Sequence, residues 1–167
     1  MIHHPDVSLP ASLPTLDADF WSLRFVVESC ESFSVRKNVQ QPWSVITDRG
    51  VMASVYVQGG YGYAATSDTS PEGIRDVLER AAQWARATSR YALTDSRILP
   101  RPAPRGVYAS PSLDVELPDR REWFDLLQRE SMEAGFDPRI VDWEALLDVR
   151  HATHRLITSE GGDVVQR

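Results

Sequence analysis

The sequence is short of several features, and each shortage excludes a class of protein. It holds one cysteine, Cys30, in 167 residues, so no internal disulfide can form. It holds one lysine, Lys37, and has a formal net charge of −6, so we expect no direct contact with nucleic acid. No apolar run approaches the roughly 20 residues that cross a membrane. The N-terminus lacks a basic stretch followed by an apolar core, so we expect a cytoplasmic protein.

The composition that remains is that of an ordinary globular protein, with 42% hydrophobic and 25% charged residues. A chain of this length can bury roughly two-thirds of its unfolded surface, enough for one core or two small lobes. Residues 1–18 hold three prolines and no helix period, so they predict an extended lead-in before a domain at residues 19–167. We interpret His3 and His4 in this lead-in as a solvated pair, because a metal site needs further, rigidly held ligands.

Alternation of apolar and polar residues predicts several strands. Residues 20–28 and 33–39 alternate, and we expect them to form a hairpin that turns at residues 29–31. Cys30 lies in this expected turn without a neighbouring His or Lys, which indicates an incidental thiol rather than a nucleophile. A second tight turn is expected at Asp48-Arg49-Gly50, and further strands at residues 140–149 and 155–158.

The stretch after Val57 predicts a hairpin followed by a long helix. Gly59-Gly60 is a two-residue turn signal, and Ser70-Pro71-Glu72 is typical of a helix start. The helix is expected to run to about Tyr91 with an apolar stripe toward the sheet, formed by Ile74, Val77, Leu78, Ala81, Trp84, Ala85 and Thr88.

The region beyond this helix predicts an irregular connection and a short helix. Residues 95–118 hold five prolines and show neither the helix period nor the strand period of apolar residues, which indicates a long irregular loop. Asp119 and Glu122 have the spacing of a capping box, so a helix is expected from there to about Ala134. Gly135 is placed to end it in a left-handed cap.

One pattern occurs twice. Residues 45–50 and 156–161 share the form apolar-Ile-Thr-x-x-Gly, which suggests two copies of one strand-turn unit. The second copy stops soon after Gly162, so we expect the chain to be the front part of something larger. The predicted fold class is α+β, with an antiparallel sheet built from two related strand-turn units and helices packed on one face.

No catalytic or metal-binding residue is predicted. Gly60-x-Gly62-x-x-Ala65 resembles a dinucleotide-binding loop, but the helix begins too late, so we interpret it as a sheet corner that packs closely. His151 and His154 stand three apart on an expected strand or turn, where side chains face opposite sides, and are interpreted as surface histidines.

Taken in order, these blocks resemble a known family over about residues 17–166. Gly-Gly-Tyr-Gly-Tyr-Ala-Ala-Thr-Ser-Asp at 59–68, the Ser-Pro-Glu helix, the proline-rich connection, the short helix and Leu-Ile-Thr-Ser-Glu-Gly at 156–161 are similar to the N-terminal domain of the TldD/PmbA family, also called modulators of DNA gyrase. One departure is clear, because the family usually opens with a helix and the lead-in here does not look like one.

The resemblance implies a role in peptide proteolysis. TldD-type members are cytoplasmic zinc metallopeptidases that work as dimers with a PmbA-type (TldE) partner lacking the metal. Their zinc helix, His-Glu-x-x-x-His, lies in the C-terminal half, and no histidine here is followed by glutamate. The resemblance therefore implies a non-catalytic front domain without a cofactor of its own, zinc in the missing half, peptide or unfolded-protein substrates, and a homo- or hetero-dimer; either member type fits.

The expected peptide groove or interface lies in the glycine-rich hairpin and comprises Gly59, Gly60, Tyr61, Gly62 and Tyr63. An extended peptide can add to an exposed strand there through backbone hydrogen bonds. The alternative is a free-standing binding or assembly module without peptidase activity. A nucleotide-binding enzyme that uses the Gly60 loop is the least favoured hypothesis.

Overall fold

The computed structural model describes residues 15–93, 96–98, 100–101, 103–111 and 115–167. The predicted lead-in therefore lies mostly outside the described residues, and His3 and His4 lie wholly outside them. The elements in chain order are β1 (Phe20–Arg36), β2 (Val39–Gln40), β3 (Ser44–Val57), β4 (Gly60–Thr66), α1 (Pro71–Ser89), the 3-10 helix η1 (Ser96–Ile98), β5 (Arg105–Tyr108), α2 (Arg120–Ala134), β6 (Glu144–Thr158) and β7 (Asp163–Gln166). Among the helices described, none combines the length and the apolar character needed to span a membrane.

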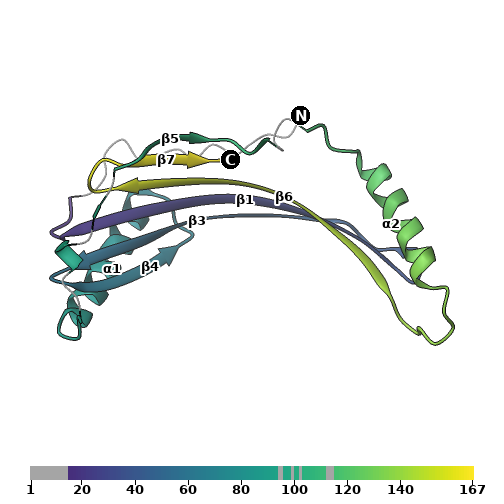
Figure 1. Ribbon diagram of the computed structural model, residues 1–167, viewed down its shortest axis with the longest axis horizontal. Helices are drawn as coiled ribbons and strands as arrows, with labels where there is room; N and C mark the ends of the chain where they lie inside the picture. The colour runs from purple at the N-terminus through teal and green to yellow at the C-terminus, as the bar shows by residue number, and fades with distance from the viewer. Residues whose placement is uncertain (1–14, 94–95, 99, 102, 112–114) are drawn as a thin grey trace. The chain divides into compact units, whose positions relative to one another are not determined.

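The strands form one seven-stranded sheet in the order β4-β3-β1-β6-β7-β5, with β2 paired to β1 (Figure 1). The α+β class is confirmed. Strands β3 and β4 pair antiparallel, as do β6 and β7, but β5 pairs parallel to β7, so the sheet is mixed. The predicted loop at residues 95–118 was wrong at β5, because four strand residues between prolines are too few to show a period.

The expected hairpin at residues 29–31 is wrong, because β1 runs uninterrupted from Phe20 to Arg36. The apolar positions before and after this segment share one parity, as a single strand requires. The turn lies later, at Lys37-Asn38, where both residues have positive φ (49° and 64°) and join β1 to β2.

The expected turn at Asp48-Arg49-Gly50 is also wrong, because these residues lie within β3. Gly50 serves close packing instead, since a Cβ there would stand 2.9 Å from the carbonyl oxygen of Thr66. The two predicted strands at 140–149 and 155–158 are one strand, β6. The first copy of the repeated motif, at residues 45–50, therefore lies within a strand, whereas the second, at residues 156–161, leads into a turn. The prediction of two related strand-turn units is not confirmed.

The hairpin and the helix after Val57 are confirmed, with shifts at their ends. The turn consists of Gln58 and Gly59, with φ of 49° and 84°, so that Val57 pairs with Gly60. The Ser70 side chain accepts a hydrogen bond from the Gly73 amide at the start of α1, which ends at Ser89.

Part of the predicted stripe on α1 is wrong. Trp84 is 62% exposed, and Ala82 is buried beside Ala81 and Ala85 instead. Because Gly62 lies against this part of the helix, the backbones approach too closely for an indole ring to fit between them.

The chain divides into two compact units, each with its own core. The first comprises the described parts of Met1–Val27, Asp48–Ser110 and Ala152–Arg167. Its core lies between α1 and the sheet, where α1 runs along β3 and β4 (Figure 1). The buried residues of this core are Leu23, Phe25, Val51, Ala53, Val55, Val57, Ile74, Val77, Leu78, Ala81, Ala82, Ala85 and Ile157.

The second unit comprises Glu28–Thr47 and the described part of Pro111–His151. Phe33, Val35 and Leu127 form its core, and the ring of Phe124 meets that of Phe33 edge-on at 5.5 Å. The capping box at the start of α2 is confirmed, with Asp119 and Glu122 each bonding the other's backbone amide.

The left-handed cap expected at Gly135 is wrong, because its φ is −83°. A Cβ at Gly135 would stand 2.5 Å from the ring of Trp143. Glycine suits this position because the indole packed against it leaves no room for a Cβ.

Candidate functional site

The five residues expected to form a groove or interface lie at the β3–β4 turn and along β4, and they divide into two kinds. Gly60 and Gly62 face α1, where an added Cβ would stand 2.0 Å from the carbonyl oxygen of Ala85 and 2.2 Å from that of Ala81. Only glycine lets β4 and α1 approach this closely. The interpretation of the Gly60 segment as a closely packed sheet corner is therefore confirmed.

Tyr61 and Tyr63 alternate with these glycines along β4 and are 44% and 62% exposed. They belong to an aromatic row with Phe20 and Tyr56, which crosses β1, β3 and β4. Neighbouring ring centroids in the row are 6.1, 5.0 and 6.3 Å apart. Tyrosine combines a large apolar ring with a polar tip, which suits a surface that another molecule covers.

The outer edge of β4 is partly closed by α1. The Tyr61 amide donates to Thr88 Oγ1 over 3.1 Å, and the Thr88 hydroxyl lies 2.8 Å from the Tyr61 carbonyl oxygen. Arg80 Nη2 donates to the Ala65 carbonyl over 3.0 Å. A helix that satisfies edge groups protects the strand from pairing with another chain. Strand β4 therefore presents its tyrosine rings more readily than its backbone.

Among the described residues, the other end of the sheet is open. The Asp163 amide donates to the Pro104 carbonyl and the Arg167 amide to the Tyr108 carbonyl, each over 2.9 Å. Because backbone groups alternate along a strand, the amide and carbonyl of Val107 point away from β7. Val107 is 70% exposed, and β5 ends the strand order of the described sheet. This edge was missed in the sequence because prolines flank it.

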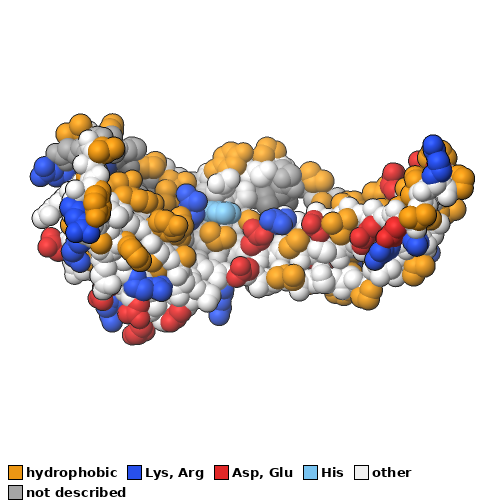
Figure 2. Space-filling view, turned by 90° about the horizontal axis from the view of Figure 1, so that it is seen from below, with side chains coloured by type: hydrophobic (Ala, Val, Ile, Leu, Met, Phe, Trp, Pro, Cys, Tyr) orange, Lys and Arg blue, Asp and Glu red, His pale blue; other side chains and the backbone are white. Residues whose placement is uncertain are grey.

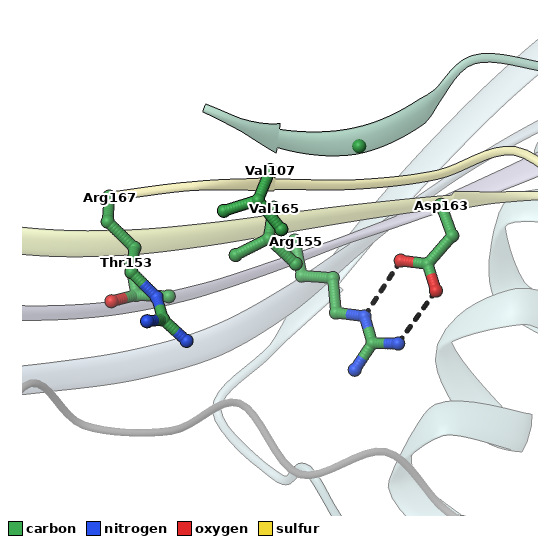
Figure 3. A pocket seen from close by; sticks show the side chains of 7 residues that line it. Val107, Thr153, Arg155, Asp163, Val165 and Arg167 are labelled. Atoms are coloured by element: carbon green, nitrogen blue, oxygen red, sulfur yellow. Dashed lines mark hydrogen bonds and ion pairs between the residues drawn. The ribbon is translucent and has the colours of Figure 1, made fainter. Parts of the chain in front are cut away.

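A pocket of about 330 Å³ lies beside this edge, over β5, β6 and β7 (Figure 3). The Arg155 guanidinium faces the Asp163 carboxylate and donates two hydrogen bonds to it, over 2.9 and 2.7 Å. The pocket is lined by Gly106, Val107, Thr153, Arg155, Asp163, Val165 and Arg167.

These contacts keep Asp163 ionised. The hydrogen bonds from Arg155 lower the pKa of the Asp163 carboxyl below its usual value, and the charges of Arg155 and Arg105 add to this, while partial burial opposes it. None of these residues stood out in the sequence, although alternation along one long strand would have placed Thr153 and Arg155 on the same side.

Within the described part of the chain, no cluster of three or more His, Cys, Asp or Glu residues could hold a metal ion. His151 and His154 both lie on β6, three residues apart, where strand alternation directs them to opposite faces. Cys30 lies within β1, with its sulfur 3.9 Å from Ser32 Oγ. On the face drawn in Figure 2, basic and acidic side chains are interspersed rather than gathered by sign.

The fold is shared with proteins of known structure. A protein described as a modulator of DNA gyrase from Bacteroides thetaiotaomicron superposes with a TM-score of 0.62 at 16% identity, over 89% of this chain and 34% of its own. TldE from Thermococcus kodakarensis gives 0.62 at 19% identity, over 89% and 34%. A second protein described as a gyrase modulator, from Thermotoga maritima, gives 0.52 at 15%, over 87% and 33%. The chain thus spans about a third of the length of these structures.

The fold thus defines an α+β domain of the kind found in these larger proteins. Residues 21–85 match the family described as PmbA/TldA metallopeptidase domain 1. This match, together with the shared fold, confirms the resemblance to the N-terminal domain of the TldD/PmbA family that was noted in the sequence. No curated protein matches it.

Proposed function

We propose that this chain is the non-catalytic, substrate- and partner-facing N-terminal domain of a TldD/PmbA-type zinc metallopeptidase of the cytoplasm. The observation that carries the proposal is the match of residues 21–85 to a metallopeptidase domain of this family. In the proposal, the zinc and its ligands belong to another part of the enzyme. This domain's work is then to bind the peptide and the second subunit.

Substrate binding is assigned to the open edge of β5. A peptide that lies beside Arg105–Tyr108 can pair with the outward amide and carbonyl of Val107. Backbone pairing makes no demand on side-chain identity, which suits an enzyme that acts on peptides and unfolded proteins. Strand β4 is less suited to this role, because Thr88 and Arg80 already hold two of its outward positions.

Partner binding is assigned to the hairpin that contains Gly59, Gly60, Tyr61, Gly62 and Tyr63. Gly60 and Gly62 fix β4 against α1, and Tyr61 and Tyr63 present rings on the aromatic row. Exposed tyrosines are enriched where subunits meet, because they bury much apolar area at a small entropic cost. The partner is a second copy of the chain or a related subunit of the family.

The peptide assignment is tested with acetyl-Thr-Val-Thr-Val-Thr-Val-amide, which lacks charged ends, in an NMR titration of the chain. We expect shifts at the amides of residues 105–109. Val107→Pro removes an amide that points away from β7, so the native pairing is kept while binding weakens by roughly tenfold.

Val107→Thr is the matched control, because it keeps the amide, and it should bind the peptide as the unmodified chain does. Equal binding by Val107→Pro and Val107→Thr would show that the peptide does not add to β5. Absence of any binding would contradict the peptide-binding role itself.

A further inference from the structure

We propose that the pocket over β5, β6 and β7 binds a carboxylate group carried on a small apolar body. Two sources share this chemistry, a peptide C-terminus and a free organic acid. The peptide source rests on the proposed function, whereas the acid source does not.

Arginines give the pocket an excess of positive charge. Arg155 and Arg167 line the pocket. Arg105 lies nearby: its charge helps to lower the pKa of Asp163, and its Nε donates a hydrogen bond to the Gly161 carbonyl over 2.8 Å. The paired bonds to Asp163 hold the Arg155 guanidinium in one orientation. Because these bonds engage Nε and Nη2 of Arg155, the planar fork left to match a ligand carboxylate is that of Arg167, while Arg155 offsets the charge of Asp163.

Thr153 supplies an independent sign of a ligand. It is 2% exposed, and its Oγ1 has no hydrogen-bond partner in the part of the chain that the structure describes. A buried hydroxyl without a partner is rare and costly, and an acceptor oxygen in the pocket would satisfy it.

The strand register places these groups in order along the pocket. Ile157 pairs with Asp163 and Arg155 with Val165, so Thr153 falls opposite Arg167 beyond the paired ends. Figure 3 shows the same order, with Thr153 and Arg167 at one end and Asp163 at the other. A carboxylate near Thr153 and Arg167 therefore lies at the end away from Asp163.

The rest of the lining favours a carboxylate over a phosphate. The ionised Asp163 repels a dianion more than a monoanion, and Val107 and Val165 offer apolar contact to a hydrocarbon group. The pocket volume of about 330 Å³ lies at the lower end of ligand-binding cavities, which suits one amino-acid residue or a small acid.

The probes are N-acetyl-L-valine, its amide and inorganic phosphate, each titrated into the chain by NMR. We expect N-acetyl-L-valine to shift the amides of Thr153, Arg155 and Val165. We expect its amide and phosphate to bind at least about tenfold more weakly. Equal binding of the amide, or of phosphate, would overturn the assignment of a carboxylate.

Variants separate binding from folding. Thr153→Val removes the unpartnered hydroxyl without changing the shape, so we expect unchanged or higher resistance to urea together with roughly fivefold weaker acetylvaline binding. Arg155→Gln leaves the negative charge of Asp163 unpaired, so it should weaken acetylvaline binding by about tenfold, and Arg121→Gln on α2 is the exposed control, with no effect. If both Thr153→Val and Arg155→Gln bind acetylvaline as the unmodified chain does, the inference is wrong.

The source is distinguished with acetyl-Thr-Val-Thr-Val-Thr-Val as its free acid and as its amide. If the free-acid peptide binds more tightly than both the peptide amide and acetylvaline, the ligand is a peptide C-terminus. If acetylvaline binds more tightly than its own amide but the free-acid peptide binds no more tightly than the peptide amide, the ligand is a free organic acid. Acetylvaline binding without any binding of the peptide amide would contradict the proposed function only. Binding of the peptide amide without acetylvaline binding would contradict this inference only.

Discussion

At the residue scale, Ser131 is the most connected buried polar group in the second unit. Its hydroxyl accepts from the Asn38 amide over 3.2 Å and from Trp143 Nε1 over 3.0 Å, and donates to Asn38 Oδ1 over 2.9 Å. The side chain is fully buried on α2. One hydroxyl therefore fastens the Lys37-Asn38 turn and the indole of Trp143 to the helix.

Ser131→Ala should destabilise the chain by about 2–4 kcal/mol, because three groups lose a partner and stay shielded from water. The measurement is the urea unfolding curve followed by tryptophan fluorescence. Ser44→Ala, at an exposed position of β3, is the control and should change stability by less than about 0.5 kcal/mol. A Ser131→Ala curve that overlies the control would show that this network contributes little.

Glycines show how far single residues could be interpreted from the sequence. Close packing at Gly60 and Gly62 was predictable, because glycines inside a strand often mark a place where another backbone approaches closely. The role of Gly135 was not, because it depends on Trp143, which belongs to a later segment. The role of a glycine could therefore be predicted where it depends on the local strand pattern, but not where it depends on contact with a side chain from another segment.

At the scale of elements, the β1–β2 and β3–β4 turns contain non-glycine residues with positive φ. Besides Lys37 and Asn38, Gln58 has φ of 49° in the β3–β4 turn and is followed by Gly59. Two-residue turns of this kind favour Asn-Gly, because asparagine tolerates the left-handed region better than glutamine. The backbone amide of Gln58 is held by Asp19 Oδ2 over 2.6 Å, and this bond does not depend on the side chain.

Gln58→Asn should therefore stabilise the chain by about 0.5–1 kcal/mol, seen as a higher unfolding temperature. The matched change Gln40→Asn, in strand β2, should be neutral or destabilising because asparagine disfavours strands. A lower unfolding temperature for Gln58→Asn than for Gln40→Asn would contradict this account of the turn.

The same elements show why strand limits were missed. A period of two identifies a strand but not its end, so β1, β3 and β6 were each divided where polar residues or glycine interrupted the apolar pattern. Helices were placed well, because Ser70 and Asp119 cap them through local bonds. The open edge at β5 could not be foreseen, because its only described strand neighbour, β7, follows it by more than fifty residues.

At the scale of the whole molecule, the chain divides into two compact units. The sheet formed by the described residues ends in a partly closed edge at β4 and an open edge at β5. The order of sequence blocks predicted the resemblance to the family, and the family model matches at residues 21–85. The pocket could not be predicted, because it combines β5 with the β6–β7 hairpin, which lies far from β5 in the sequence.

We propose above that this chain is the front domain of a metallopeptidase whose zinc lies elsewhere. The most direct measurement is the reading frame that follows the codon for Arg167 in the source gene. The account predicts that the frame continues: a following His-Glu-x-x-x-His identifies a TldD-type enzyme, and a continuing frame without it identifies the PmbA-type partner. A stop codon at or near Arg167 would contradict the claim and favour a free-standing binding module.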